Sequence, residues 1–108
     1  MKNKVLELRK EGIYCPDGDF FVDPRGNVER ALITHAHSDH ARPGHSSYLC
    51  SDTCKPLLKL RIGEHSVINS LPFGKKIKIG KATVSFHPAG HILGSAQVRV
   101  EVGGQVWV

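Results

Sequence analysis

Residues 31–40 read ALITHAHSDH, an apolar run that leads into three histidines and one aspartate. The apolar half predicts the end of a buried strand, and the polar half predicts a loop at that end. In an extended or tightly turned loop, His35, His37 and Asp39 project to one side and the turn brings His40 round. Imidazole nitrogens and carboxylate oxygens are ligands that zinc prefers in proteins. The stretch therefore predicts a site that can hold two metal ions side by side.

A fifth candidate ligand, His91, lies in the stretch PAGHILG at residues 88–94, which proline and glycine bracket. The alternative interpretation is that all these side chains are ordinary polar residues of loops at strand ends. Single histidines are common in such loops, but four ligand-type side chains within six residues are not. The zinc site is therefore the preferred interpretation.

The same two stretches resemble a known family. Residues 34–45 (THAHSDHARPGH) and residues 88–97 (PAGHILGSAQ) are similar to motifs of the metallo-β-lactamase superfamily and, within it, of the β-CASP nucleases. The chain looks like the ligase-associated DNA exonucleases and the mRNA 3′-end processing factor-like proteins of that branch, from about residue 12 to residue 108. The resemblance implies an α/β (α+β) fold: the N-terminal half of an αββα sandwich, mostly strands with few helices, and a site at one edge of its two sheets.

The resemblance also implies roles for the candidate ligands. His35, His37 and His91 would hold one zinc ion through neutral imidazoles, and Asp39 with His40 would hold the second, with manganese as an alternative metal. Asp39 and His40 would thereby also be catalytic, and the reaction would be hydrolysis of a phosphodiester bond in nucleic acid.

Other side chains near the motifs have less definite roles. Asp23 matches an early aspartate of the family, whose implied task is to orient the metal loop as a hydrogen-bond acceptor; the alternative is a turn aspartate before a proline. His87 is interpreted as structural because the proline after it breaks any helix that would align it with the last candidate ligand. His45 and His65 are interpreted as loop or surface residues. Arg42 either touches phosphate or is a solvated side chain.

The length of 108 residues allows one domain with a core and excludes a second. Residues 97–102 alternate polar and apolar side chains, Gly103 and Gly104 predict a turn, and residues 105–108 begin a partner strand. In the family, such a strand leads to an aspartate that bridges the metals, and the β-CASP region follows. We therefore expect residues 1–108 to be a partial metallo-β-lactamase domain, truncated before both and inactive alone; the alternative is a naturally minimal domain.

The rest of the chain predicts a sheet-rich fold with one helix. Residues 5–11 favour either a short helix or a strand, and the helix is expected at residues 53–61, with Lys55 and Lys59 on a solvated face opposite Leu57 and Leu60. Strands are expected at residues 20–23, 28–34, 47–50, 75–79 and 82–87 and in the 97–108 hairpin.

Three cysteines and the absence of a signal-peptide pattern predict reduced thiols near the core of a cytoplasmic protein. Cys50 and Cys54 could form half of a metal site, but the chain lacks a second Cys/His pair at finger-like spacing. No stretch has the apolar length needed to cross a membrane, so a soluble protein is expected.

The formal net charge of +5 and the pI near 9.3 favour polyanionic partners without choosing among them. Part of this charge is clustered at Lys75, Lys76, Lys78 and Lys81, which are equally compatible with a solvated surface. The expected partners are DNA or RNA and, by the family resemblance, the DNA ligase machinery; residues 41–45 (ARPGH) favour DNA. Two alternatives stay open: a hydrolase of a small ester, thioester or lactam, and a non-catalytic nucleic-acid-binding or scaffold protein.

Overall fold

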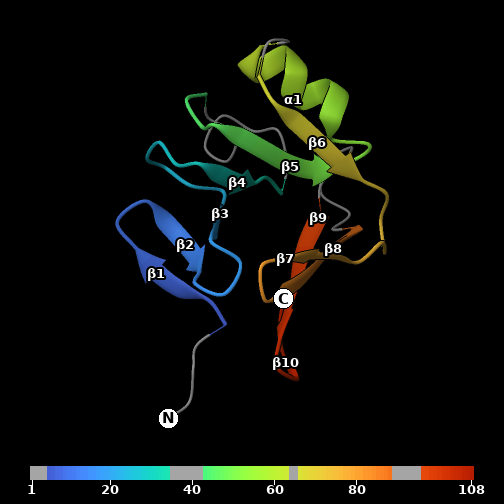
Figure 1. The fold of residues 1–108 in the computed structure, drawn as a ribbon. Coiled ribbons are helices and arrows are strands. Elements are labelled where there is room, and N and C mark those ends of the chain that lie inside the picture. Colours follow the sequence, from blue (N-terminus) through green and yellow to red (C-terminus); the bar gives the residue numbers. More distant parts are fainter. Residues whose placement is uncertain (1–4, 35–42, 64–65, 89–95) are drawn as a thin grey trace.

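The computed structural model describes residues 5–34, 43–63, 66–88 and 96–108 (Figure 1). These ranges hold ten strands and one helix, so the expectation of a strand-rich chain with little helix is confirmed. The elements are β1 (Glu7–Arg9), β2 (Gly12–Cys15), β3 (Phe20–Val22), β4 (Arg30–Leu32), β5 (Ser47–Ser51), α1 (Lys55–Ile62), β6 (Ile68–Leu71), β7 (Ile77–Ile79), β8 (Ala82–Pro88), β9 (Ala96–Val102) and β10 (Gln105–Trp107).

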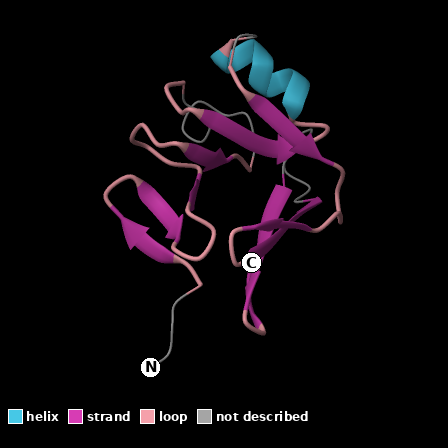
Figure 2. Cartoon of the chain, in the orientation of Figure 1, coloured by secondary structure: helices cyan, strands magenta, loops and turns pink. Residues whose placement is uncertain are grey.

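The strands, drawn in magenta in Figure 2, form two sheets. The first sheet has the order β1-β2-β3-β4-β5-β6; its first three strands are antiparallel neighbours, and β3 to β6 run parallel. The second sheet has the order β10-β9-β8-β7 and is antiparallel throughout. A run of parallel strands places several strand ends side by side in the first sheet, and Asp23 and Thr34 follow two of these ends.

Successive side chains of the central strands point to opposite faces and so separate two apolar clusters. Ala31 and Ile33 pack with Tyr48 and with Leu58 of α1, while Leu32 packs between the sheets with residues such as Phe86. The order of layers in the described part of the chain is therefore helix, sheet, sheet. This is the arrangement expected for part of an αββα sandwich.

The three cysteines are free and fully buried, as predicted. Cys50, in β5, and Cys54, immediately before α1, both belong to the cluster under the helix. The hydrogen bond to Cys54, together with burial, raises the pKa of the Cys50 thiol, so this thiol stays protonated. None of the helices in the described residues could span a membrane.

The helix differs from the prediction in two respects. It begins at Lys55 with Cys54 as its N-cap, and no side chain caps it. Leu60 is 85% exposed, whereas Leu58 is fully buried. Since successive helix residues are about 100° apart around the axis, Leu60 points almost directly away from Leu58. The prediction that Leu60 lies on the apolar face was wrong: Leu58 is the buried leucine of the helix, and the half-buried Leu57 packs against the same cluster.

The turn between β7 and β8 packs closely against the first sheet and gives a test of the fold. Gly80 has φ +60, and a Cβ there would lie 2.5 Å from the carbonyl oxygen of Asp17, whereas Gly103 has φ +54 with nothing within 4 Å. We expect Gly80→Ala to lower the free energy of unfolding by about 1–3 kcal/mol more than Gly103→Ala, because overpacking adds to the same backbone strain. Urea denaturation measures both; equal losses would contradict the packing of this turn.

Candidate functional site

The parallel strands β3 and β4 end side by side, and the residues that follow them are joined through one carboxylate. Asp23 follows β3 directly, and Thr34 lies two residues after β4. The Oδ1 atom of Asp23 accepts the backbone N–H of Thr34 at 2.9 Å, and Oδ2 accepts its hydroxyl at 2.6 Å. We call this pair of contacts the Asp23–Thr34 clamp.

The backbone of Asp23 is held in the geometry that the clamp requires. Its N–H donates to the carbonyl oxygen of Leu32 at 2.8 Å, and its φ of +46 is unusual for a residue other than glycine. Hydrogen bonds to a charged acceptor contribute about 1.5–3 kcal/mol each, enough to offset the strain of such a conformation. The clamp thus fixes the residue that immediately precedes His35.

Thr34 also connects the two sheets. Its carbonyl oxygen accepts the N–H of Ala96, the first residue of β9, at 2.8 Å, and Ala96 is in turn paired with Pro88 at the end of β8. Thr34, Pro88 and Ala96 therefore lie in one small region of the fold. Thr34 precedes the segment 35–42, and Pro88 and Ala96 flank the segment 89–95. Those two segments carry all five of the candidate metal ligands.

After residue 42, hydrogen bonds of His45 fix the chain again. The Nδ1 atom of His45 accepts the backbone N–H of Val28 at 3.2 Å, and the His45 N–H donates to the hydroxyl of Tyr48 at 3.3 Å. The two rings meet edge to face, with centroids 5.2 Å apart. His45 is 8% exposed, and burial lowers its pKa, so the ring is neutral near pH 7.

His45 is therefore a loop residue, one of the two alternatives in its interpretation, but it is buried and not a surface residue. Its partner Val28 lies 17 residues earlier in the sequence, and no local pattern indicates a contact across that distance. The nearest signal is the aromatic Tyr48 three residues later, at the start of a predicted strand.

The proposed ligands His35, His37, Asp39, His40 and His91 lie outside the described residues, as do Arg42 and His65. Their arrangement stays a prediction. Within residues 5–34, 43–63, 66–88 and 96–108, no group of three or more histidine, cysteine or acidic side chains could hold a metal ion. The structure thus describes the supports on either side of the candidate loops rather than the loops themselves.

His87 has a partner within its own sheet. Its Nε2 atom is 2.9 Å from the hydroxyl of Ser85, which is 1% exposed. Residues two apart on a strand share a face, so this contact follows from the regular geometry of β8. A structural role accounts for His87 without a metal.

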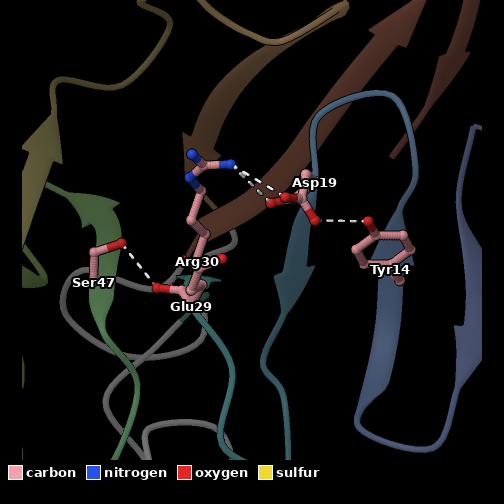
Figure 3. A network of polar contacts seen from close by, with 5 residues as sticks. All are labelled: Tyr14, Asp19, Glu29, Arg30 and Ser47. Atoms are coloured by element: carbon pink, nitrogen blue, oxygen red, sulfur yellow. Dashed lines mark hydrogen bonds and ion pairs between the residues drawn. The ribbon is translucent and has the colours of Figure 1, made fainter.

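A second polar network lies at the other ends of the parallel strands, where β4 and β5 begin (Figure 3). Asp19 accepts the hydroxyl of Tyr14 at 2.7 Å and lies 3.5 Å from Arg30, while Ser47 donates to the carbonyl oxygen of Glu29 at 3.0 Å. The hydrogen bond to Asp19 raises the pKa of Tyr14. Because the Arg30 and Asp19 side chains are more than half exposed, this ion pair contributes little to stability. Asp19 therefore serves as a control for Asp23.

The clustered lysines lie on or beside the edge strand β7. Lys75, Lys76, Lys78 and Lys81 are all exposed. Lys76 approaches Glu101 at 4.0 Å, and Glu101 also accepts a hydrogen bond from Arg99 at 2.7 Å, which lowers the pKa of Glu101. The exposed positions leave these lysines able to contact a polyanion.

The layers and the strand order can now be compared with those of known proteins. The structure is similar to that of a metallo-β-lactamase from Cronobacter sakazakii, with a TM-score of 0.66 and 12% identity. The match covers 87% of this chain and 53% of that protein. A second match, to a subclass B3 metallo-β-lactamase of Bradyrhizobium japonicum, covers 72% of this chain and 38% of that protein, with a TM-score of 0.52 and 20% identity. The chain has the metallo-β-lactamase fold. At these identities the likeness shows the fold alone, and the fold hosts more than one kind of reaction.

The sequence comparison finds a relative with a different name. The chain is 37% identical over 93 residues to a protein of Opitutus terrae named a probable DNA ligase. The match covers 85% of this chain and 9% of that protein, so the chain spans a small part of its relative. No family model matches the chain.

Proposed function

We propose that the chain carries the metal-binding loops of a zinc-dependent phosphodiester hydrolase that acts on nucleic acid, a DNA exonuclease of the β-CASP kind. The observation that carries this proposal is the junction at Thr34. There the Asp23–Thr34 clamp and the bond to Ala96 hold together the ends of the two segments in which every candidate ligand lies.

The candidate ligands fit zinc by their chemistry. Four imidazoles and one carboxylate are nitrogen and oxygen donors of the kind that bind zinc in catalytic sites, where fewer protein ligands than a closed structural site leave a position open. When bound, zinc supplies Lewis-acid chemistry that favours deprotonation of water near neutral pH and offsets charge on phosphate oxygens.

In this proposal the side chains have two roles. The metals are held by the imidazoles of His35, His37, His40 and His91 and by the carboxylate of Asp39. Asp23 orients the start of the loop through the N–H and hydroxyl of Thr34. This support matters because hydrogen bonds one step removed from a metal fix the orientation of its ligands.

Nucleic acid is favoured as the substrate by three features. Residues 34–45 and 88–97 resemble the motifs of β-CASP nucleases, the net charge is +5, and the relative in Opitutus terrae bears the name of a probable DNA ligase. An exonuclease that works beside a ligase is consistent with that name, and the ligase machinery is the partner we propose. The charge alone would be weak support because many solvated surfaces are basic.

A small-molecule hydrolase is the second candidate, because both structural neighbours described above are metallo-β-lactamases. One panel of substrates separates the two. Since the chain spans 53% of the Cronobacter sakazakii protein, the test uses the product of the whole reading frame that contains it. Labelled DNA and RNA, a lactam and a thioester are each incubated with zinc, with manganese and with a chelator. Chelator-sensitive cleavage of DNA supports the proposal; hydrolysis of the lactam or thioester with no action on either nucleic acid would overturn it.

The lysines near β7 allow binding to be tested apart from chemistry. We expect simultaneous replacement of Lys75, Lys76 and Lys78 by alanine to weaken DNA binding and to flatten its salt dependence, by about 1 in logarithmic slope for each lysine that neutralises a phosphate. Replacement of Lys55 and Lys59, which lie in α1 and are half-buried and exposed respectively, is the control. Fluorescence anisotropy at several salt concentrations measures both. An unchanged slope in the triple variant would show that these lysines do not face the substrate.

A further inference from the structure

The segment that follows residue 42 is fastened to the sheet more firmly than a surface loop. The Ser46 N–H donates to the carbonyl oxygen of Val28 at 3.0 Å, and the Ser47 N–H donates to that of Glu29 at 2.8 Å. A Cβ at Gly44, whose φ is +103, would lie 2.5 Å from the Oδ1 atom of Asn27. Residues 44–47 therefore run against residues 27–29, and the Asn27 side chain occupies the space beside Gly44.

Two side chains of this junction contact backbone: the Ser47 hydroxyl donates to the carbonyl oxygen of Glu29, and the His45 ring accepts the N–H of Val28. Because the Val28 N–H donates to Nδ1, that nitrogen carries no proton, and the proton of the neutral ring is on Nε2. The Nε2 atom is buried and has no hydrogen-bond partner among the described residues. A buried donor normally has a partner, and the hydrogen bond to one ring nitrogen sets which nitrogen carries the proton.

The two junctions lie on either side of the same eight residues. Thr34 is held by Asp23 just before residue 35, and His45 is held by Val28 and Tyr48 three residues after residue 42. Fixing both ends of a short loop lowers the conformational entropy that the loop has before a metal binds. Ligands on a loop fixed in this way bind a metal with less loss of freedom.

We propose that His45 is a positioning residue for the metal loop: the acceptor Nδ1, bonded to the Val28 N–H, fixes the far end of the loop and thereby strengthens zinc binding. This inference rests on the proposed function, because zinc binding by residues 35–40 is part of it. His45 itself binds no metal in this account.

Substitutions at His45 can separate the acceptor from the rest of the ring. In asparagine, Oδ1 is attached to Cγ as Nδ1 is in histidine, so His45→Asn keeps an acceptor for the Val28 N–H. In glutamine the acceptor lies one bond further out, and alanine has none. We expect zinc affinity to be close to the original in His45→Asn and about 10-fold or more weaker in His45→Gln and His45→Ala. His87→Ala is the control and should leave zinc affinity unchanged.

Zinc affinity is measured on the product of the whole reading frame by competition with a chromogenic chelator, and circular dichroism checks folding. Equal affinity in the original protein and in folded His45→Gln and His45→Ala overturns the inference and leaves the proposed function standing. A His45→Asn variant as weak as His45→Gln also overturns it, because the acceptor then does not matter. If His45→Ala does not fold, the asparagine and glutamine variants decide. If the original protein binds no zinc, the proposed function fails, and this inference fails with it.

Discussion

Replacing His37 by alanine is expected to stop phosphodiester cleavage by the product of the whole reading frame and to lower its zinc content, while DNA binding persists. Removing a hydrogen-bonded support of a metal ligand typically costs 10–100-fold in affinity or activity, so removing the ligand itself should cost more than about 100-fold. Asp39→Ala and His40→Ala should have the same effect. Single-turnover cleavage, metal analysis and anisotropy measure the three quantities separately.

The control for these variants is His87→Ala. His87 is bonded to Ser85 within β8, so its loss should affect stability slightly and cleavage much less than the loss of His40. Damage by His87→Ala equal to that by His40→Ala, at unchanged metal content, would mean that the ligands near Pro88 are wrongly assigned.

Replacing Asp23 by alanine is expected to lower both zinc affinity and cleavage by about 10–100-fold, because the two hydrogen bonds that hold Thr34 are lost. Asp23→Asn should be milder. Its amide oxygen can still accept the Thr34 N–H, and the threonine hydroxyl can accept from the amide nitrogen. Chelator competition and single-turnover cleavage check the order of the three proteins.

Asp19→Ala is the matched control for Asp23. Asp19 also accepts a hydroxyl hydrogen bond, from Tyr14, but it lies beside the start of the parallel strands rather than their ends. We expect it to leave zinc affinity unchanged. If Asp19→Ala and Asp23→Ala weakened zinc binding equally, the effect would be a general loss of stability and not the loss of the clamp.

Much of the sheet could be predicted from local sequence. The regular alternation of Gln97 to Val102 and the glycine pair after it predicted the hairpin of β9 and β10, and the apolar run before Thr34 predicted β4. Such patterns are local, so one short stretch carries the whole signal. The strand at β6 was missed because Ile68-Asn69-Ser70-Leu71 has two apolar residues in four and only Ile68 is buried.

The supports of the candidate site could be predicted only in part. A metal ligand set is visible in a sequence because zinc requires particular residue types at close spacing. The bond between Thr34 and Ala96 joins two backbone groups far apart in the chain, which any residue could supply. In the bond between Val28 and His45 the donor is likewise a backbone group, 17 residues before the histidine that accepts it. Their positions depend on how the two sheets and the parallel strands pack, and no residue type in the sequence predicts them.

The proposed nuclease requires that the histidines and aspartate of residues 35–40, together with His91, hold zinc. Elemental analysis of the purified product of the whole reading frame, after dialysis against metal-free buffer, tests this without a substrate. We predict two zinc ions per chain, in keeping with a pair of metals at a phosphodiester site, and loss of bound zinc in a His35→Ala/His37→Ala double variant that still folds. A protein that retains no metal, or a double variant that keeps the full zinc content, would contradict the account.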